Sequence, residues 1–133
     1  MRYLLLAAEK GDADAQFNLG VFYDSRVDDN NKPAASNRAE AIKWLLRAAQ
    51  QGLPRAQTRL AELYADERDA AADYVKAGAW FLLAAAGHSG ALRAEAQSGF
   101  ERVSARMTHA QIVKSRRLAG GWKPRRSATA TAA

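Results

Sequence analysis

Residues 3–23 read YLLLAAEKGDADAQFNLGVFY, and the chain repeats this pattern as WLLRAAQQGLPRAQTRLAELY at residues 44–64. With an offset of 41, nine of the twenty aligned positions are identical, whereas unrelated segments of average composition would share about one or two. The identical pairs are Leu4/Leu45, Leu5/Leu46, Ala7/Ala48, Ala8/Ala49, Gly11/Gly52, Ala15/Ala56, Gln16/Gln57, Leu19/Leu60 and Tyr23/Tyr64. A weaker third copy, WFLLAAAGHSGAL, begins at Trp80. Repetition at this period indicates a helical solenoid.

Each repeat is predicted to form a helix A, a tight turn and a helix B. In the second repeat, Asn37 and Glu40 have the spacing of a capping box that would begin helix A. Gly52 can end that helix in the left-handed conformation, and Pro54 suits the first position of helix B. In the first repeat, residues 11–12 (Gly-Asp) have the same turn and cap roles.

The apolar positions recur at helical spacing and predict the core. The predicted core residues are Ala41, Trp44, Leu45, Ala48, Ala49, Ala56, Leu60, Leu63 and Tyr64 in the second repeat, and Ala15, Leu19, Phe22 and Tyr23 in the first. Paired alanines allow neighbouring helices to approach closely. We expect an aromatic residue, Tyr3, Trp44 or Trp80, to fill the gap between repeats.

The third repeat and the C-terminal end show the same helical spacing of apolar residues. Helix B of the third repeat is predicted at 91–107, with a buried stripe of Leu92, Ala96, Phe100, Val103 and Met107. Thr108 and Gln111 make another capping box, and the short helix after it, with Trp122, is predicted to cover the last apolar face. The predicted organisation is a solenoid at 1–122, with repeats at about 1–36, 37–72 and 73–107, a capping helix at 108–122, and a disordered basic tail at 123–133.

Composition and motifs argue against an enzyme. The chain has no cysteine, which excludes thiol chemistry, disulfides and Cys-ligated zinc. GHSGA at 87–91 approaches a nucleophile elbow, but that motif needs a preceding strand, and Ser89 is better explained as a helix N-cap. His88 and His109 have no metal-ligating partner at suitable spacing. We therefore predict no catalytic residue, no metal and no cofactor.

The repeated pattern aromatic-xxxAAxxGxxxAQxxL(G/A)xxY resembles the Sel1-like repeat, a relative of the tetratricopeptide repeat. The segment from Met107 to Trp122 is similar to the C-terminal ends of many proteobacterial Sel1-repeat proteins. The family's G-x-G-V loop is missing after Tyr23 and after Tyr64. The resemblance implies an all-α, right-handed α-solenoid that acts as a non-enzymatic adaptor for protein complexes, in bacteria often in the periplasm or envelope.

The N-terminal sequence bears on the compartment. MRYLLLAA opens like a signal peptide, but its apolar part is too short and EKGD follows it. The first repeat also lacks the opening turns of helix A, which suggests the C-terminal part of a longer protein. For such a part we expect periplasmic or envelope association, and otherwise a cytoplasmic location. No apolar run is long enough to cross a membrane, and we expect a monomer or a part of a longer chain.

The leading hypothesis places a peptide or partner protein along the concave groove that helices A line in such solenoids. The candidate binding residues are Arg2, Leu6, Lys43, Arg47, Lys76 and Leu83. A row that mixes leucine with cations can hold a peptide by apolar contact and charge. The competing interpretation is an ordinary solvated helix face.

The alternative hypothesis concerns charge. The formal net charge is +6, and it arises after residue 90, where nine Lys or Arg face two Glu. The basic segment consists of Lys114, Arg116, Arg117, Lys123, Arg125 and Arg126. It could bind nucleic acid or an anionic surface electrostatically. No recognition-helix pattern accompanies these cations, so a solubilising tail is the competing interpretation and nucleic acid is the weaker expectation.

Overall fold

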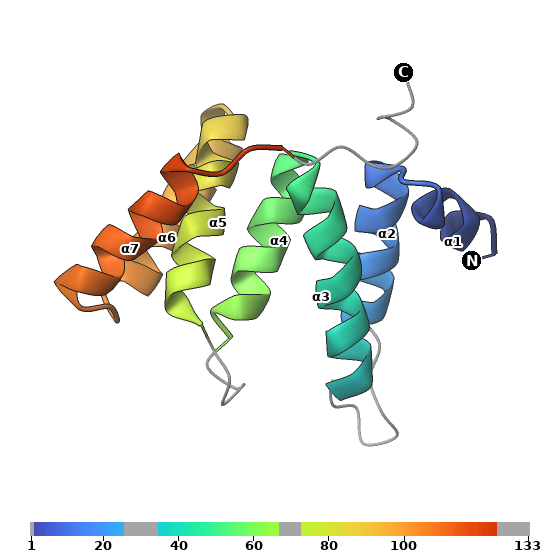
Figure 1. Cartoon of the computed structure of the whole chain (residues 1–133), viewed down its shortest axis with the longest axis horizontal. Coiled ribbons are helices and arrows are strands. Elements are labelled where there is room, and N and C mark those ends of the chain that lie inside the picture. The colour runs from blue at the N-terminus through green and yellow to red at the C-terminus, as the bar shows by residue number, and fades with distance from the viewer. Residues whose placement is uncertain (1, 26–34, 67–72, 125–133) are drawn as a thin grey trace. The chain divides into compact units, whose positions relative to one another are not determined.

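A computed structural model describes residues 2–25, 35–66 and 73–124 of the chain, with backbone alone at 35–36. Within these ranges every regular element is a helix, which confirms the predicted all-α class (Figure 1). The helices are α1 (Arg2–Glu9), α2 (Ala13–Asp24), α3 (Ala35–Gln50), α4 (Pro54–Tyr64), α5 (Tyr74–Gly87), α6 (Gly90–Ser104) and α7 (His109–Gly120). They form two compact units, Met1–Ala56 and Gln57–Lys123.

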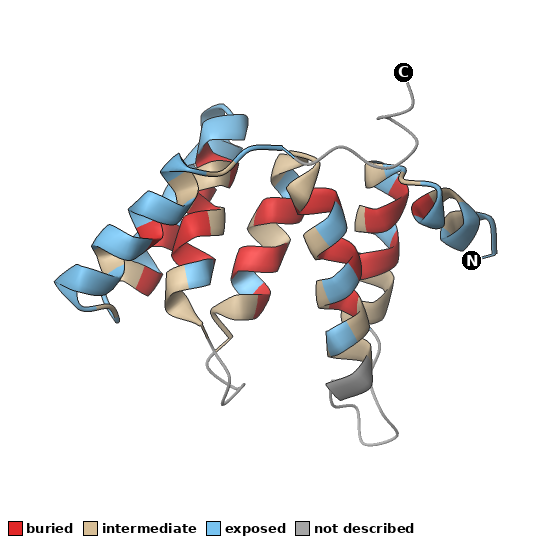
Figure 2. Ribbon diagram, viewed as in Figure 1, coloured by how far each residue is buried: buried red, intermediate tan, exposed pale blue. Residues whose placement is uncertain are grey.

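In the first unit, α1 packs on α2 and α2 packs on α3. The buried residues of this core are Ala8, Ala15, Leu19 and Trp44, and Figure 2 shows buried positions gathered on α2 and α3. A Cβ atom on Gly20 of α2 would lie 2.6 Å from Cγ of Leu45 on α3. Small residues at the contact therefore set how closely these two helices approach.

The turns between helices A and B match the prediction. Gly11 and Gly52 have φ angles of 100° and 94°, in the left-handed region that glycine adopts without strain. The side chain of Asp12 accepts a hydrogen bond of 3.1 Å from the backbone N–H of Ala15, so it caps α2. Pro54 is the first residue of α4.

The predicted start of the second helix A is wrong. Helix α3 begins at Ala35, so Asn37 lies inside the helix and does not cap it. Residues 35–36 already have helical backbone, and alanine is the residue with the highest helix propensity. Glu40 instead forms an ion pair with Lys43, with a distance of 3.8 Å from Oε2 to Nζ.

In the second unit, α5 packs against both α6 and α7. The buried cluster consists of Ala61, Ala77, Phe81, Phe100 and Val103. A Cβ atom on Gly99 of α6 would lie 2.7 Å from Cδ1 of Phe81. The absence of a side chain at this position lets α6 lie directly against the Phe81 ring.

The stripe predicted for the third helix B is partly wrong. Ala96, Phe100 and Val103 are buried, and Met107 packs against the cluster, but Leu92 is 56% exposed. Residues 91–95 are all exposed, so the first turn of α6 extends beyond the core. The helix also ends at Ser104 rather than at residue 107.

The C-terminal helix covers α5, in agreement with the predicted capping role. The capping box is present: the N–H of Gln111 donates to Oγ1 of Thr108 at 3.2 Å, and Oε1 of Gln111 accepts from the N–H of Thr108 at 2.8 Å. Trp122 meets Trp80 edge to face, with ring centroids 6.2 Å apart. Of the tail at 123–133 that is predicted to be disordered, the part after Pro124 lies outside the described residues.

The three aromatic residues predicted to fill gaps differ in their surroundings. Trp44 is only 3% exposed, and Trp80 is partly buried. The prediction is wrong for Tyr3, which is 86% exposed. Ala8 is the buried residue of α1, and Tyr3 lies on the part of this short helix that α2 leaves uncovered.

Candidate functional site

Two exposed cations of α3 lie over a buried indole ring. Nζ of Lys43 is 5.0 Å from the centroid of Trp44, and Cζ of Arg47 is 4.9 Å from it. Both distances are within the range of cation–π attraction. Lys43 and Arg47 stand one turn apart on the helix and are exposed, whereas Trp44 is buried. The ring therefore lies beneath two cationic side chains that are close together at the surface, which we call the cation pair. Lys43 also forms the exposed ion pair with Glu40 at 3.8 Å.

The other residues of the predicted helix-A row differ in exposure. On α1, Arg2 and Leu6 are exposed. On α5, Lys76 is exposed, with Nζ 5.6 Å from the ring centroid of Tyr64, and Leu83 is partly buried. Three alanines of the same helices, Ala8 of α1, Ala49 of α3 and Ala85 of α5, are buried. That the row forms one continuous groove stays a prediction.

A buried glutamine links the helices of the first unit, and the sequence analysis assigned it no role. Nε2 of Gln16 donates to the carbonyl oxygen of Ala8 at 3.0 Å, and its Oε1 accepts from Nε2 of Gln51 at 2.9 Å. The carbonyl of Ala8, near the end of α1, also accepts a hydrogen bond of 3.1 Å from the backbone N–H of Gly11, so the bond from Gln16 is its second. The identity of Gln16 and Gln57 in the repeat alignment was the available signal for this role.

Tyr64 is the described residue with a clearly displaced pKa. Burial, and then the negative charge of Asp73, raise the pKa of its phenol from the ordinary 10.0. The folded state therefore keeps this proton at a pH where the unfolded chain has lost it. We expect the resulting stability to be present below pH 10 and to be lost as the pH rises through the folded pKa. Urea titrations of the wild type and of Tyr64→Phe above pH 10 should show a weaker pH dependence in the variant; an identical dependence would contradict the assignment.

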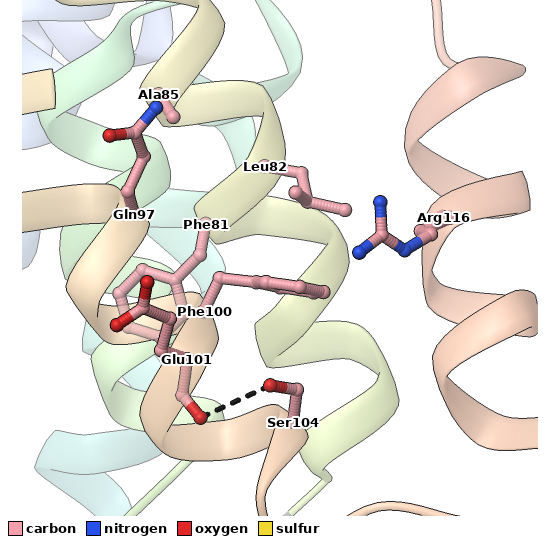
Figure 3. A pocket seen from close by; sticks show the side chains of 8 residues that line it. All are labelled: Phe81, Leu82, Ala85, Gln97, Phe100, Glu101, Ser104 and Arg116. Carbon is pink, nitrogen blue, oxygen red and sulfur yellow. Dashed lines mark hydrogen bonds between the residues drawn. The ribbon is translucent and has the colours of Figure 1, made fainter. Parts of the chain in front are cut away.

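A pocket of about 510 Å³ lies in the second unit, between α5, α6 and α7 (Figure 3). Phe81, Leu82 and Ala85 from α5 and Phe100 from α6 form its apolar lining. Gln97, Glu101 and Ser104 from α6 and Arg116 from α7 supply its polar groups. The guanidinium carbon of Arg116 lies 5.4 Å from the centroid of Phe100. We refer to this feature as the α6 pocket. This pocket was not predicted from the sequence.

The basic segment is described in part. Lys114, Arg116, Arg117 and Lys123 are exposed, whereas Arg125 and Arg126 lie outside the described residues. Lys114 and Arg117 border a shallow apolar hollow on the outer face of α7, formed with Ala110, Val113 and Leu118. Arg116 is turned instead toward Phe100. Helix α7 contains no acidic residue.

The described part of the chain offers no metal-binding cluster. No group of three or more His, Asp or Glu residues is arranged there to hold a metal ion. GHSGA at 87–91 joins α5 to α6, so the strand required by a nucleophile elbow is not present, and Ser89 occupies the N-cap position of α6. Across residues 2–25, 35–66 and 73–124, no helix has both the length and the apolar character that crossing a bilayer requires.

Comparison with known proteins identifies the repeats. The Sel1 repeat matches residues 1–12, 13–53 and 54–89. The chain is also similar to c5321, a protective antigen present in uropathogenic Escherichia coli strains, whose crystal structure displays an SLR fold. The TM-score is 0.72 and the sequence identity is 29%, and the match covers 89% of this chain but 24% of that protein. No curated protein matches the chain. Matching repeats over two thirds of its length show that the chain belongs to the Sel1 repeat family.

Proposed function

We propose that the chain is a non-enzymatic interaction module that binds an acidic peptide segment of a partner protein. The cation pair of α3 would be the centre of the binding surface, with Arg2 and Leu6 of α1, in the same unit, as further contacts. Sel1-repeat proteins generally act as protein-interaction scaffolds. That general role supports a protein partner and leaves its identity open.

The observation that carries the proposal is the position of Lys43 and Arg47 over Trp44. A long cationic side chain normally loses rotamer freedom when it binds a partner, and this cost lowers the affinity. Contact with a ring that the core holds in place restricts these two side chains before binding. Two restrained cations one turn apart are suited to carboxylates of a peptide, because charge-assisted hydrogen bonds are the stronger ones.

A peptide-display selection tests the proposal. We expect 12-residue random peptides selected on the wild-type chain to be enriched in Asp and Glu. The double variant Lys43→Glu, Arg47→Glu should lose most of this enrichment, because it reverses both charges at the surface. Arg93→Glu with Arg102→Glu is the matched control, since both arginines are exposed on α6 and the change in net charge is equal. Enrichment without acidic residues, or equal loss in both double variants, would contradict the proposal.

The electrostatic alternative rests on α7, which carries three cations and no acidic residue. Among the described residues of this segment, Lys114, Arg116, Arg117 and Lys123 are exposed. No recognition-helix pattern accompanies them, and we therefore rank this alternative second. Binding of duplex DNA or anionic vesicles through this segment would weaken steeply with added salt and would disappear on deletion of residues 123–133 together with Lys114→Ala and Arg117→Ala.

A further inference from the structure

We propose that the α6 pocket anchors an apolar side chain of a partner peptide, and that an acidic residue next to this anchor pairs with Arg116. The inference rests on the proposed role as a peptide-binding module. It concerns a separate site, however, because none of the residues of the predicted helix-A row lines this pocket. Most of its polar groups come from α6, a helix B.

The lining of the pocket suits an apolar anchor. Phe81 is 2% exposed and Phe100 is 9% exposed, so both rings are held by the core. Gly99 stabilises this arrangement, because its lack of a side chain leaves room for Phe81 directly beneath α6. The volume of about 510 Å³ is within the range of pockets that take ligand groups, about 300–1,000 Å³. Interface anchors are typically large side chains in preformed pockets of this kind.

The polar groups are divided between two sides of the pocket. Figure 3 shows Arg116 extending from α7 toward Leu82, while Gln97 and Glu101 lie on the α6 side. The carboxylate of Glu101 and the amide of Gln97 form no hydrogen bond or ion pair with any described residue; the bond drawn in Figure 3 is donated by Ser104 to the backbone carbonyl of Glu101. These two side chains are thus available to a ligand.

This division of charge specifies the ligand. On the α7 side the pocket is lined by Arg116, and no acidic residue of α7 opposes its charge, so that side favours a carboxylate. Near Glu101, a second carboxylate would be repelled, whereas the N–H groups of a peptide backbone can donate to it. A peptide supplies all three elements together: an apolar side chain, backbone N–H donors and an adjacent acidic residue. A nucleic acid would bring phosphates close to Glu101 and is disfavoured for that reason.

The test is an NMR titration of the ¹⁵N-labelled full chain with the synthetic peptide GSGFDSG. We expect its addition to shift the amide signals of residues 81–85 and 97–104 in a saturable manner. Two control peptides separate the contributions: GSGADSG lacks the apolar anchor, and GSGFKSG reverses the adjacent charge. Both should bind at least about tenfold more weakly at these residues.

Protein variants then assign the partner of the aspartate. Arg116→Glu should weaken GSGFDSG at least about tenfold, whereas Arg117→Glu, the same charge reversal one residue later and outside the pocket lining, should change the affinity little. Arg116→Gln provides the same comparison if the glutamate variant fails to fold. Equal shifts with GSGADSG, equal effects of the two arginine variants, or no shifts at residues 81–85 and 97–104 would overturn the inference.

The same titration separates this inference from the proposed function. Lys43→Glu with Arg47→Glu should leave the shifts at residues 97–104 intact, since it alters α3 alone. Retained shifts in that variant, together with a failed acidic-peptide selection, would support the inference about the α6 pocket. They would contradict the proposed role of the cation pair. Loss of the selection in Arg116→Glu rather than in the α3 variant would assign the acidic preference to this pocket.

Discussion

Replacing Trp44 with alanine is expected to lower the free energy of unfolding by about 3–5 kcal/mol, the usual cost of truncating a buried large aromatic residue. Trp44 is 3% exposed and packs with Ala8, Ala15 and Leu19 at the centre of the first unit. The substitution leaves a cavity that surrounding helices fill only in part, and it also removes the ring that restrains Lys43 and Arg47. Chemical denaturation followed by circular dichroism measures the effect.

Tyr3→Ala is the matched control for that experiment. Tyr3 occupies the equivalent position in the first repeat but is 86% exposed, so its removal should change the free energy of unfolding by less than about 0.5 kcal/mol. Similar losses in the two variants would show that the two aromatic residues share one environment, in contradiction to the structure.

The second large effect is expected at Gly99. Alanine normally stabilises a helix relative to glycine by about 1 kcal/mol. At Gly99 the added methyl group would overlap the ring of Phe81, which the core keeps from moving. We therefore expect Gly99→Ala to lower the free energy of unfolding by about 1–3 kcal/mol, the usual cost of overpacking.

Gly120→Ala is the matched comparison, for which we expect a change in the free energy of unfolding that is zero or of opposite sign. Gly120 ends α7, and nothing lies within 4 Å of where its Cβ atom would be. The same substitution should be neutral or should stabilise the chain by up to about 1 kcal/mol. Thermal or urea denaturation of both variants tests the pair. A gain at both positions would mean that α6 does not lie against Phe81 as described.

The parts of the fold that sequence predicted correctly depend on local chemistry. A left-handed glycine, an Asp N-cap and a capping box each involve residues within a few positions of one another, as at Gly11, Asp12 and Thr108. The repeated apolar pattern also predicted the fold class correctly, because each repeat provides an independent copy of the same helical spacing.

The errors arise where the answer depends on neighbours distant in sequence. Tyr3 and Leu92 have the helical spacing of core residues, but each stands at a helix end that no described helix covers. Asn37 has good capping chemistry, yet Ala35 and Ser36 extend the helix past it. Local patterns state that a residue can be buried or can cap, whereas packing decides whether it does.

For the candidate sites too, local sequence patterns predicted single residues but not the contacts between distant ones. Lys43 and Arg47 were predicted from the repeat alignment as exposed positions, and the structure adds their contact with Trp44. The α6 pocket was not predicted, because its lining joins residues 81–85, 97–104 and 116 from three helices. Arg116 was noted only as one cation in the basic segment. Ser115, next to it, is fully buried, and its Oγ donates to the carbonyl of Val75 at 2.9 Å, a position that periodicity alone would assign to an apolar residue.

The most direct test of the central claim, that the cation pair of α3 binds an acidic peptide, is a calorimetric dissociation constant. The peptide is one recovered from the display selection, titrated into the wild-type chain and into Lys43→Glu, Arg47→Glu at equal ionic strength. We expect binding at least about tenfold weaker in the variant, a loss of about 1.4 kcal/mol or more, with an unchanged melting temperature. An equal dissociation constant for the two proteins would contradict the account.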